Sequence, residues 1–418
     1  MKRIFRIGLL AVLLLAAIGF FGFAPGIAER SMNVIDGGEL LEVSDEAREL
    51  HASLTIVDLH GDTLLWDRDL LDDGARGHMD LPRLMRGNVA LQIFSSVTKM
   101  PRGQNYESNS ADTDNITPLV IGQLQPVRTW GSLLERSLFH AEKLDRAVAA
   151  DEWGVLRTIR SHEDISTLVD HRSNSESWLR APYGVKGAAH PPIGAMFSVE
   201  GLHNLEGDLA NLQVLYDAGM RMAGLVHFFD NELAGSMHGV EKGGLTPMGR
   251  DAIRQMERMG IIVDIAHCSR ACVADVLAMA KRPVVSSHGG VQAACEENRN
   301  LTDDEIRGVA VTAGVIGIGY WPGAVCDTSP RAIAKAMRHV RDLVGIEYVA
   351  LGSDFDGAVT VRFDTSQLVQ VTQALLDEGF SHEEIRLAMG GNALRVIQRG
   401  IIPLDPPMPP LPAPERSS

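Results

Sequence analysis

Histidine and acidic side chains follow several short apolar runs in this chain, at the points where those runs give way to polar sequence. His60 and Asp62 come just after the first run, and because side chains alternate along an extended segment, they project to the same side. His267 and His288 each end a later run. Imidazole nitrogens and carboxylate oxygens are ligands for divalent metals of the zinc type. One His-x-Asp pair is a weak signal, but the repeated pattern predicts a metal site.

A further carboxylate, Glu200, ends another apolar run, and it either completes the coordination of one metal or bridges two. His227 ends a run of its own, and three roles are open to it: metal ligand, structural histidine or hydrogen-bond donor to the substrate. If Glu200 bridges, five ligands already supply two metals. We therefore expect His227 to donate a hydrogen bond to an oxyanion that develops on the substrate.

Three other residues are candidates for proton transfer, turn formation and substrate binding. In Gly-Ser-Asp-Phe-Asp-Gly, Asp354 comes first after an apolar run and is the candidate for proton transfer, whereas Asp356 is expected to hold the turn. Arg299 lies just before a helix whose expected N-terminal cap is Thr302. It is either an ordinary surface residue or a bidentate partner for a substrate carboxylate.

These side chains need a scaffold that brings the ends of the apolar runs together. Helical segments alternate with the runs, which is typical of repeated βα units and a parallel sheet. An open doubly wound sheet would also fit this alternation. The gathering of polar residues at the run ends favours a closed α/β fold, the (β/α)₈ TIM barrel with peripheral insertions, because its active sites lie at the carboxyl ends of the strands. The expected strands are 54–59, 89–94, 195–199, 222–227, 261–265, 284–287, 315–319 and 348–351, and expected helices include 251–259, 270–280 and 303–311.

Four other stretches are predicted to lie outside the barrel. Residues 100–128 lack periodicity and are expected to form a long loop or lid over the barrel mouth, and residues 172–192 a surface insertion. Residues 29–50 are expected to form an N-terminal extension, and the Pro-rich residues 403–418 a tail. The folded domain is thus predicted to span residues 51–402.

The N-terminus has the order of an export signal. Three basic residues within the first six precede an apolar run at 7–24, and Gly26-Ile27-Ala28 offers small residues for cleavage. The run is also nearly long enough to span a bilayer, so residues 1–28 are expected to be either a cleaved signal peptide or an N-terminal membrane anchor. No cysteine stands near its end, which excludes a lipoprotein anchor. The rest of the chain is expected to be exported, either periplasmic or otherwise extracytoplasmic.

Charge and cysteine content narrow the function further. The chain has 39 Lys and Arg against 54 Asp and Glu, a formal net charge of −15, which argues against an extended nucleic-acid interface. Its four cysteines, Cys268, Cys272, Cys295 and Cys326, are not spaced as a zinc finger. Export would permit them to pair, and for Cys268 and Cys272 we favour packing in the core.

Taken together, these motifs resemble those of the membrane (renal-type) dipeptidases, over about residues 52 to 400 and in the order of the family. The resemblance implies a dizinc TIM barrel that hydrolyses dipeptides, in many members including those with a C-terminal D-residue. The matching features are the His-x-Asp at 60–62, Ser-Val-Glu-Gly at 198–201, the two run-ending histidines, Gly-Leu-Thr-Pro-x-Gly at 244–249, Arg-Asn-Leu-Thr-Asp-Asp at 299–304 and Gly-Ser-Asp-Phe-Asp-Gly at 352–357.

The resemblance also implies roles for individual residues. By position, His60 and Asp62 would hold one zinc, His267 and His288 the other, and Glu200 would bridge both. The remaining matches are His227 and Arg299, which correspond to residues that contact substrate, and Asp354, which corresponds to an acid near the bridging water. The resemblance is compatible with a homodimer.

These expectations combine into a mechanism. A water shared by two cations loses a proton near neutral pH and attacks the scissile carbonyl, which one zinc and His227 polarise. Asp354 then passes the proton to the leaving amine, while Arg299 recognises the carboxylate of the C-terminal residue. Two alternatives stay open: another metal-dependent amidohydrolase acting on N-acyl amino acids or lactams, and a non-catalytic metal-binding barrel. A serine hydrolase is disfavoured because no Gly-x-Ser-x-Gly elbow stands out with a histidine and an acid in the required order.

Overall fold

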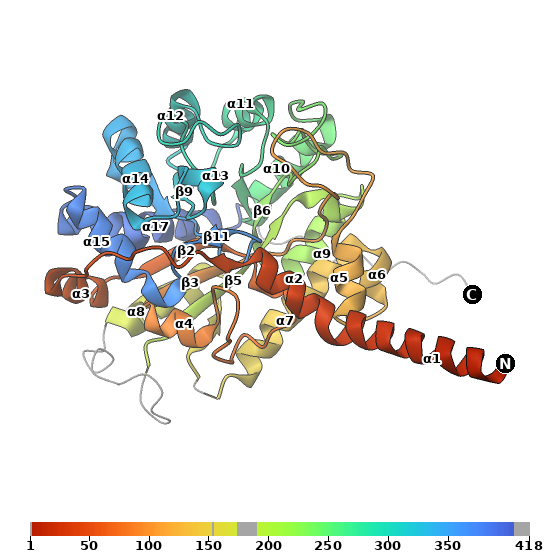
Figure 1. The fold of residues 1–418 in the computed structure, drawn as a ribbon. Helices are drawn as coiled ribbons and strands as arrows, with labels where there is room; N and C mark the ends of the chain where they lie inside the picture. Colours follow the sequence, from red (N-terminus) through yellow and green to blue (C-terminus); the bar gives the residue numbers. More distant parts are fainter. Residues whose placement is uncertain (1, 153, 174–189, 405–418) are drawn as a thin grey trace.

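The computed structural model describes residues 2–152, 154–173 and 190–404, and its centre is a closed barrel of eight parallel strands surrounded by helices (Figure 1). Hydrogen bonds between β3 and β5 close the ring, so the barrel is confirmed and the open doubly wound sheet is wrong. All eight expected strands are present. They are β2 (Ile56–Gly61), β3 (Val89–Phe94), β5 (Ile193–Glu200), β6 (Met220–Gly224), β7 (Ile262–Asp264), β8 (Val285–Ser286), β9 (Val315–Ile318) and β10 (Val349–Leu351).

The barrel strands are buried along their whole length, which explains why they read as continuous apolar runs rather than as an alternation. Each buried aliphatic side chain contributes roughly 1.5–3 kcal/mol to folding. A further short strand, β4 (Leu156–Thr158), pairs with the start of β5 outside the ring. It was not predicted, because three residues carry no usable period.

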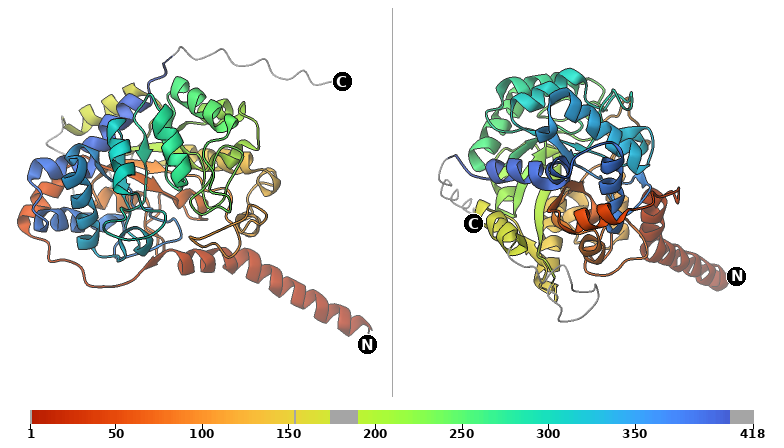
Figure 2. Two further views of the ribbon diagram at one scale, coloured as in Figure 1. Left: turned by 90° about the horizontal axis from the view of Figure 1, so that it is seen from above. Right: turned by 90° about the vertical axis from the view of Figure 1, so that its left-hand side faces the viewer.

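Helices cover the outside of the barrel (Figures 1 and 2). The three helices named from the sequence are all present. The helix that follows Arg299 has the expected cap: the Thr302 hydroxyl accepts from the Glu305 backbone N–H, and the Glu305 carboxylate accepts from the Thr302 backbone N–H. The helices of the barrel body are α4 (Leu81–Arg86), α7 (Leu133–Ala150), α8 (His162–Ser173), α9 (Asn211–Asp217), α10 (Pro247–Met259), α11 (Arg270–Met279), α12 (Asp303–Val311), α13 (Pro322–Val325), α14 (Pro330–Val344), α15 (Val369–Asp377), α16 (His382–Arg386) and α17 (Asn392–Gly400).

The N-terminal residues form a long helix that projects from the body (Figure 2). It runs through α1 (Lys2–Ile18), a π-helical turn and α2 (Ala24–Met32), and by length and composition it could cross a membrane. Beyond it, β1 (Val34–Ile35) pairs in parallel with β11 (Thr360–Val361), and α3 (Asp45–Ala52) leads into the barrel. The extension expected at residues 29–50 therefore packs on the barrel through α2 and β1.

The expected loop at 100–128 is only partly a loop. It contains α5 (Ile116–Gly122), and α6 (Arg128–Gly131) begins at its end. Asp114 begins α5 by accepting from the Ile116 N–H at 2.8 Å and the Thr117 hydroxyl at 2.6 Å, and Arg136 Nη1 donates to Asp114 at 2.7 Å. The helix was not predicted because seven residues are too few to show a helical period, and the contact between Asp114 and Arg136 joins positions 22 apart. Of the insertion expected at 172–192, residues 174–189 lie outside the described residues.

The cysteines divide into a bonded pair and two buried thiols. Cys295 and Cys326 form a disulfide between segments 31 residues apart. Cys268 and Cys272 are free and buried, so the packing role that we favoured for them is confirmed.

Candidate active site

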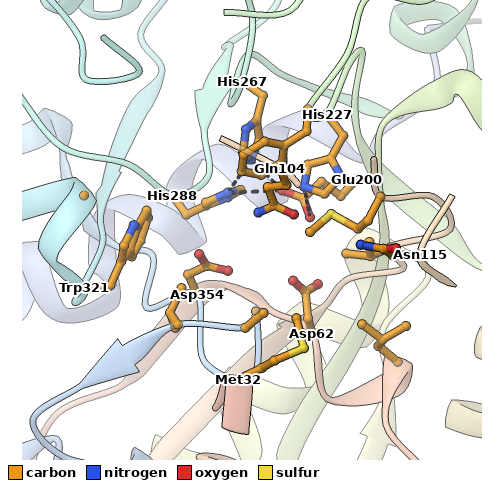
Figure 3. Close-up of a pocket in the computed structure, with 18 of the residues that line it drawn as sticks. Met32, Asp62, Gln104, Asn115, Glu200, His227, His267, His288, Trp321 and Asp354 are labelled. Atoms are coloured by element: carbon orange, nitrogen blue, oxygen red, sulfur yellow. Dashed lines mark hydrogen bonds and ion pairs between the residues drawn. The ribbon is translucent and has the colours of Figure 1, made fainter. Parts of the chain in front are cut away.

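The predicted site residues converge at one end of the barrel because all except Arg299 lie at, or within a few residues of, the carboxyl end of a strand (Figure 3). The structure brings all eight of them together. His60 and Asp62 come from β2, Glu200 from β5, His227 from the loop after β6, His267 and His288 from the segments after β7 and β8, Arg299 from the segment before α12, and Asp354 from the turn after β10.

Glu200 lies at the centre of this group. Its Oε1 is 2.8 Å from His267 Nε2 and 3.1 Å from His288 Nε2. Its Oε2 is 3.4 Å from His227 Nε2 and 3.7 Å from His60 Nε2. One carboxylate therefore faces histidines on both sides, which is the arrangement that a bridging ligand requires.

Two buried groups of ligand atoms share Glu200. One consists of His60, Asp62 and Glu200, the other of Glu200, His267 and His288, and in each the ligand atoms lie within 4.8 Å of one another. A third such group joins His60 and His288 to Asp354. Nitrogen and oxygen donors in threes are typical of catalytic zinc sites with an open position.

The donor atoms themselves fit cations. His60 Nε2 and Asp62 Oδ1 are buried without a hydrogen-bond partner, and His267 Nε2 lies 3.0 Å from His288 Nε2. Unpartnered polar atoms are costly in a protein interior, and a shared cation would remove that cost. The described residues thus suit a divalent metal.

A second layer of hydrogen bonds orients the predicted ligands. Asp264 accepts from the Ser287 N–H at 2.9 Å and from the Ser287 hydroxyl at 2.5 Å, and that hydroxyl lies 2.9 Å from His288 Nδ1. Asp58 Oδ1 accepts from the N–H groups of His60 and Ser353 at 3.3 and 3.0 Å. Such contacts fix the orientation of a histidine before a metal binds.

The surroundings shift the pKa values of Asp354 and Glu200 in opposite directions. Burial raises the pKa of the Asp354 carboxyl well above its usual range; the His60 charge opposes this rise, and the Asp62 and Glu200 carboxylates add to it. Burial also raises the pKa of Glu200, but the nearby histidines outweigh that effect and hold it well below the usual range. Glu200 is thus the more acidic of the two carboxyl groups.

The backbone at the site is in an uncommon conformation. His267 and Asp354 have φ values of +64° and +59°, which residues other than glycine rarely adopt. After Asp354 the chain needs a glycine, because a β-carbon on Gly357 would lie 1.9 Å from Asp354 Oδ1. Strain of this kind persists where the surroundings fix a functional side chain.

Asp356 differs from Asp354 in pointing into the protein. Its Oδ1 accepts from the His78 N–H at 2.6 Å, its other oxygen pairs with Arg68, and its carbonyl accepts from Trp66 Nε1 at 2.7 Å. Its expected role in holding the turn is confirmed.

A cavity of about 520 Å³ lies over the Glu200 cluster, and several of the residues that line it were not predicted from the sequence. Gln104, Tyr106 and Asn115 come from the segment expected as a lid, and Trp321 Nε1 donates to the Tyr106 hydroxyl at 3.0 Å. Met32 comes from the N-terminal helix. None had a sequence signal, because isolated aromatic, amide and methionine residues in loops do not distinguish pocket walls from ordinary packing.

Arg299 also lines the cavity and has unused donors. Its guanidinium carbon lies 4.6 Å from the centre of the Trp321 ring, and Nη2 donates to the His288 carbonyl at 3.3 Å. Among the described residues, its buried Nε has no hydrogen-bond partner. A guanidinium held in this way can bind an anionic group of a ligand by donating hydrogen bonds to it.

Comparison with known proteins agrees with this geometry. The family model of the membrane dipeptidases, peptidase family M19, matches residues 44–400. The chain belongs to this family. A dipeptidase of Aspergillus oryzae, aclJ, is 34% identical over 365 residues, which cover 82% of this chain and 77% of the relative. The dipeptidase verJ of Clonostachys rogersoniana is 30% identical over 349 residues, covering 80% and 84%.

Solved structures share the fold. The probable dipeptidase PvdM of Pseudomonas aeruginosa superposes with a TM-score of 0.67 at 19% identity, covering 85% of this chain and 98% of that one. A metallopeptidase of Rhodobacter sphaeroides, liganded with a phosphinate mimic of L-Ala-D-Ala, gives a TM-score of 0.63 at 21% identity, covering 83% and 99%.

Membership of the family confirms the resemblance seen in the sequence. The protein is a metal-dependent hydrolase of peptide bonds, a dipeptidase on a TIM barrel. Membership of a dipeptidase family argues against the alternative of a non-catalytic metal-binding barrel.

Proposed function

We propose that the protein is a dizinc dipeptidase in which Glu200 bridges two metal ions. One zinc would be held by His60 and Asp62, the other by His267 and His288. The observation that carries the proposal is the position of the Glu200 carboxylate, with one oxygen 2.8 Å from His267 Nε2 and the other 3.7 Å from His60 Nε2. Bound zinc ions would supply a water acidified to near-neutral pKa and a Lewis acid for the carbonyl.

The chain's own residues divide the remaining work. His227, buried beside Glu200, donates a hydrogen bond to the oxygen that becomes negative when the carbonyl is attacked. Asp354, whose Oδ1 is 3.9 Å from His60 Nε2, takes up a proton and delivers it to the leaving amine. Both side chains are buried, and burial strengthens both interactions.

Substrate recognition follows from Arg299 and the size of the cavity. The guanidinium binds the free carboxylate of the C-terminal residue, which places the scissile bond next to a free C-terminus. A cavity of about 520 Å³ is large enough for a dipeptide. We propose that dipeptides with a C-terminal D-residue are included, a proposal supported by the L-Ala-D-Ala mimic bound to the Rhodobacter sphaeroides metallopeptidase.

We further propose that the N-terminal helix stays on the chain as a membrane anchor. Cleavage after Ala28 would leave a protonated amine on Glu29, whose carboxylate is 1% exposed and already pairs with Arg68 and Arg76. A new positive charge next to two guanidinium groups is unfavourable there. The intact mass of the protein purified from a membrane fraction tests this proposal. A mass equal to that of a chain beginning at residue 29 would overturn it.

The test of the enzymatic proposal is a substrate panel run with the full chain in detergent. Elemental analysis should find two zinc ions per chain. Dipeptides of L,L and L,D configuration should be cleaved, chelation should abolish cleavage, and added zinc should restore it. Cleavage of N-acyl amino acids or lactams in place of dipeptides would contradict the substrate assignment.

A further inference from the structure

The cavity has a wall that the family match does not include. The match begins at residue 44, whereas Ala28 and Met32, both on α2, line the cavity together with Asp62, Glu200 and Asp354. Figure 3 shows Met32 beside Asp62 and across the cavity from His267. The segment that continues from the apolar helix is therefore part of the pocket.

A buried ion pair fixes α2 in this position. The Glu29 carboxylate, 1% exposed, pairs with Arg68 through one oxygen and with Arg76 through the other. Arg68 also pairs with Asp356, two residues after Asp354. A continuous chain of charges thus joins α2 to the turn that carries the predicted proton donor.

A second attachment lies just beyond α2. Asn33 Oδ1 accepts from the Ala358 N–H at 2.9 Å, and β1 pairs with β11 from Val34 to Ile35. Val359 and Thr360, on the β11 side of this contact, line the cavity as well. Both sides of the attachment therefore contribute to the wall of the pocket.

We propose that residues 24–36 form a wall of the substrate pocket and that Met32 is a specificity-determining residue, contacting a side chain of the dipeptide. This inference rests on the proposed site. Met32 is 42% exposed and carries a flexible thioether, which can fit side chains of different shape while excluding the largest. The residue on which substrate size depends then lies outside the residues that the family model matches.

The experiment measures kcat and KM for the full chain in detergent on dipeptides whose side chains increase in size at either position. Met32→Trp narrows the cavity and should raise the ratio of KM for the largest dipeptide to KM for Ala-Ala at least tenfold. Met32→Ala should lower the same ratio, and both changes should fall on KM more than on kcat. Ile27→Trp is the control, because Ile27 is 58% exposed on the same helix and does not line the cavity.

The outcomes are separable. If the wild type cleaves dipeptides but both Met32 variants keep its KM ratio, the inference is wrong while the proposed function stands. If both variants change KM by one common factor for all dipeptides, Met32 contributes to binding without discriminating between side chains, and the inference is wrong. If the wild type with two zinc ions cleaves no dipeptide, the proposed function itself fails. Should Met32→Trp lose its metal or its fold, Met32→Ala decides alone.

Discussion

The barrel mouth and the segments that cover it are built in different ways. At the mouth, the predicted metal ligands lie at or near the ends of buried strands, so their positions are set by hydrogen bonds of the barrel. The cover, from α2 and from residues 100–122, is held by a limited set of long-range contacts, such as those of Glu29 with Arg68 and of Arg136 with Asp114. The functional groups thus lie on the barrel itself, and the shape of the pocket depends on segments attached to it by side-chain pairs and a short strand.

The largest effect is expected at the mouth, from Glu200→Gln. The neutral amide cannot bridge two cations, so metal content should fall, and turnover should drop by at least about 1000-fold because the activated water is lost. Elemental analysis and dipeptide hydrolysis measure both. Glu241→Gln, which changes an exposed acid, should match the wild type. A Glu200→Gln protein with two metals and normal turnover would refute the bridging role.

The next effect separates proton transfer from metal binding. Asp354→Asn should lower kcat by about 100- to 10,000-fold, the range of general acid catalysis, while two metals stay bound. Single-turnover kinetics together with metal analysis of the same preparation provide the measurement. Loss of metal along with activity would show that Asp354 is a ligand, since its carboxylate also lies within reach of His60 and His288.

A smaller effect is expected for Arg299. Arg299→Met removes the partner of the substrate carboxylate, and the loss of charged hydrogen bonds should raise KM by about 10- to 100-fold with little change in kcat. The KM of Arg299→Lys should lie between those of the wild type and Arg299→Met, because lysine keeps the charge and loses the bidentate geometry. Steady-state kinetics on a dipeptide and on its C-terminal amide would test this: if the two substrates respond equally, Arg299 does not bind the carboxylate.

The cover should respond through stability. Glu29→Gln leaves Arg68 and Arg76 without their shared carboxylate, and breaking a buried pair costs about 3 kcal/mol. This cost falls on the docking of α2, so limited proteolysis between α2 and α3 should become faster while the barrel keeps its melting temperature. Arg30→Gln, at the exposed neighbouring position, is the control. A loss of barrel stability instead would show that cover and mouth fold as one unit.

The same division explains what could be predicted from the sequence. β3 and α12 were predicted with their observed bounds, because buried strands read as apolar runs and a capping residue marks a helix start. His267 and His288 were found because each interrupts such a run at its end. A polar side chain in an apolar setting is a signal that needs no knowledge of distant contacts.

The cover gave no comparable signal. Met32, Tyr106 and Trp321 are residue types that usually serve packing. Their places in the pocket depend on contacts between distant parts of the sequence, such as the one between Trp321 and Tyr106, which are 215 positions apart. β1 and β11 have two residues each, too few to show a period. The disulfide between Cys295 and Cys326 likewise depends on the folded arrangement.

The most direct test of the dizinc account is a zinc titration of the metal-stripped full chain, with dipeptide hydrolysis followed at each addition. We expect activity to rise until two equivalents of zinc per chain are bound and then to stay constant, with Glu200→Gln failing to bind the full complement. Activity that reaches its maximum at one equivalent, or that does not depend on zinc, would contradict the account.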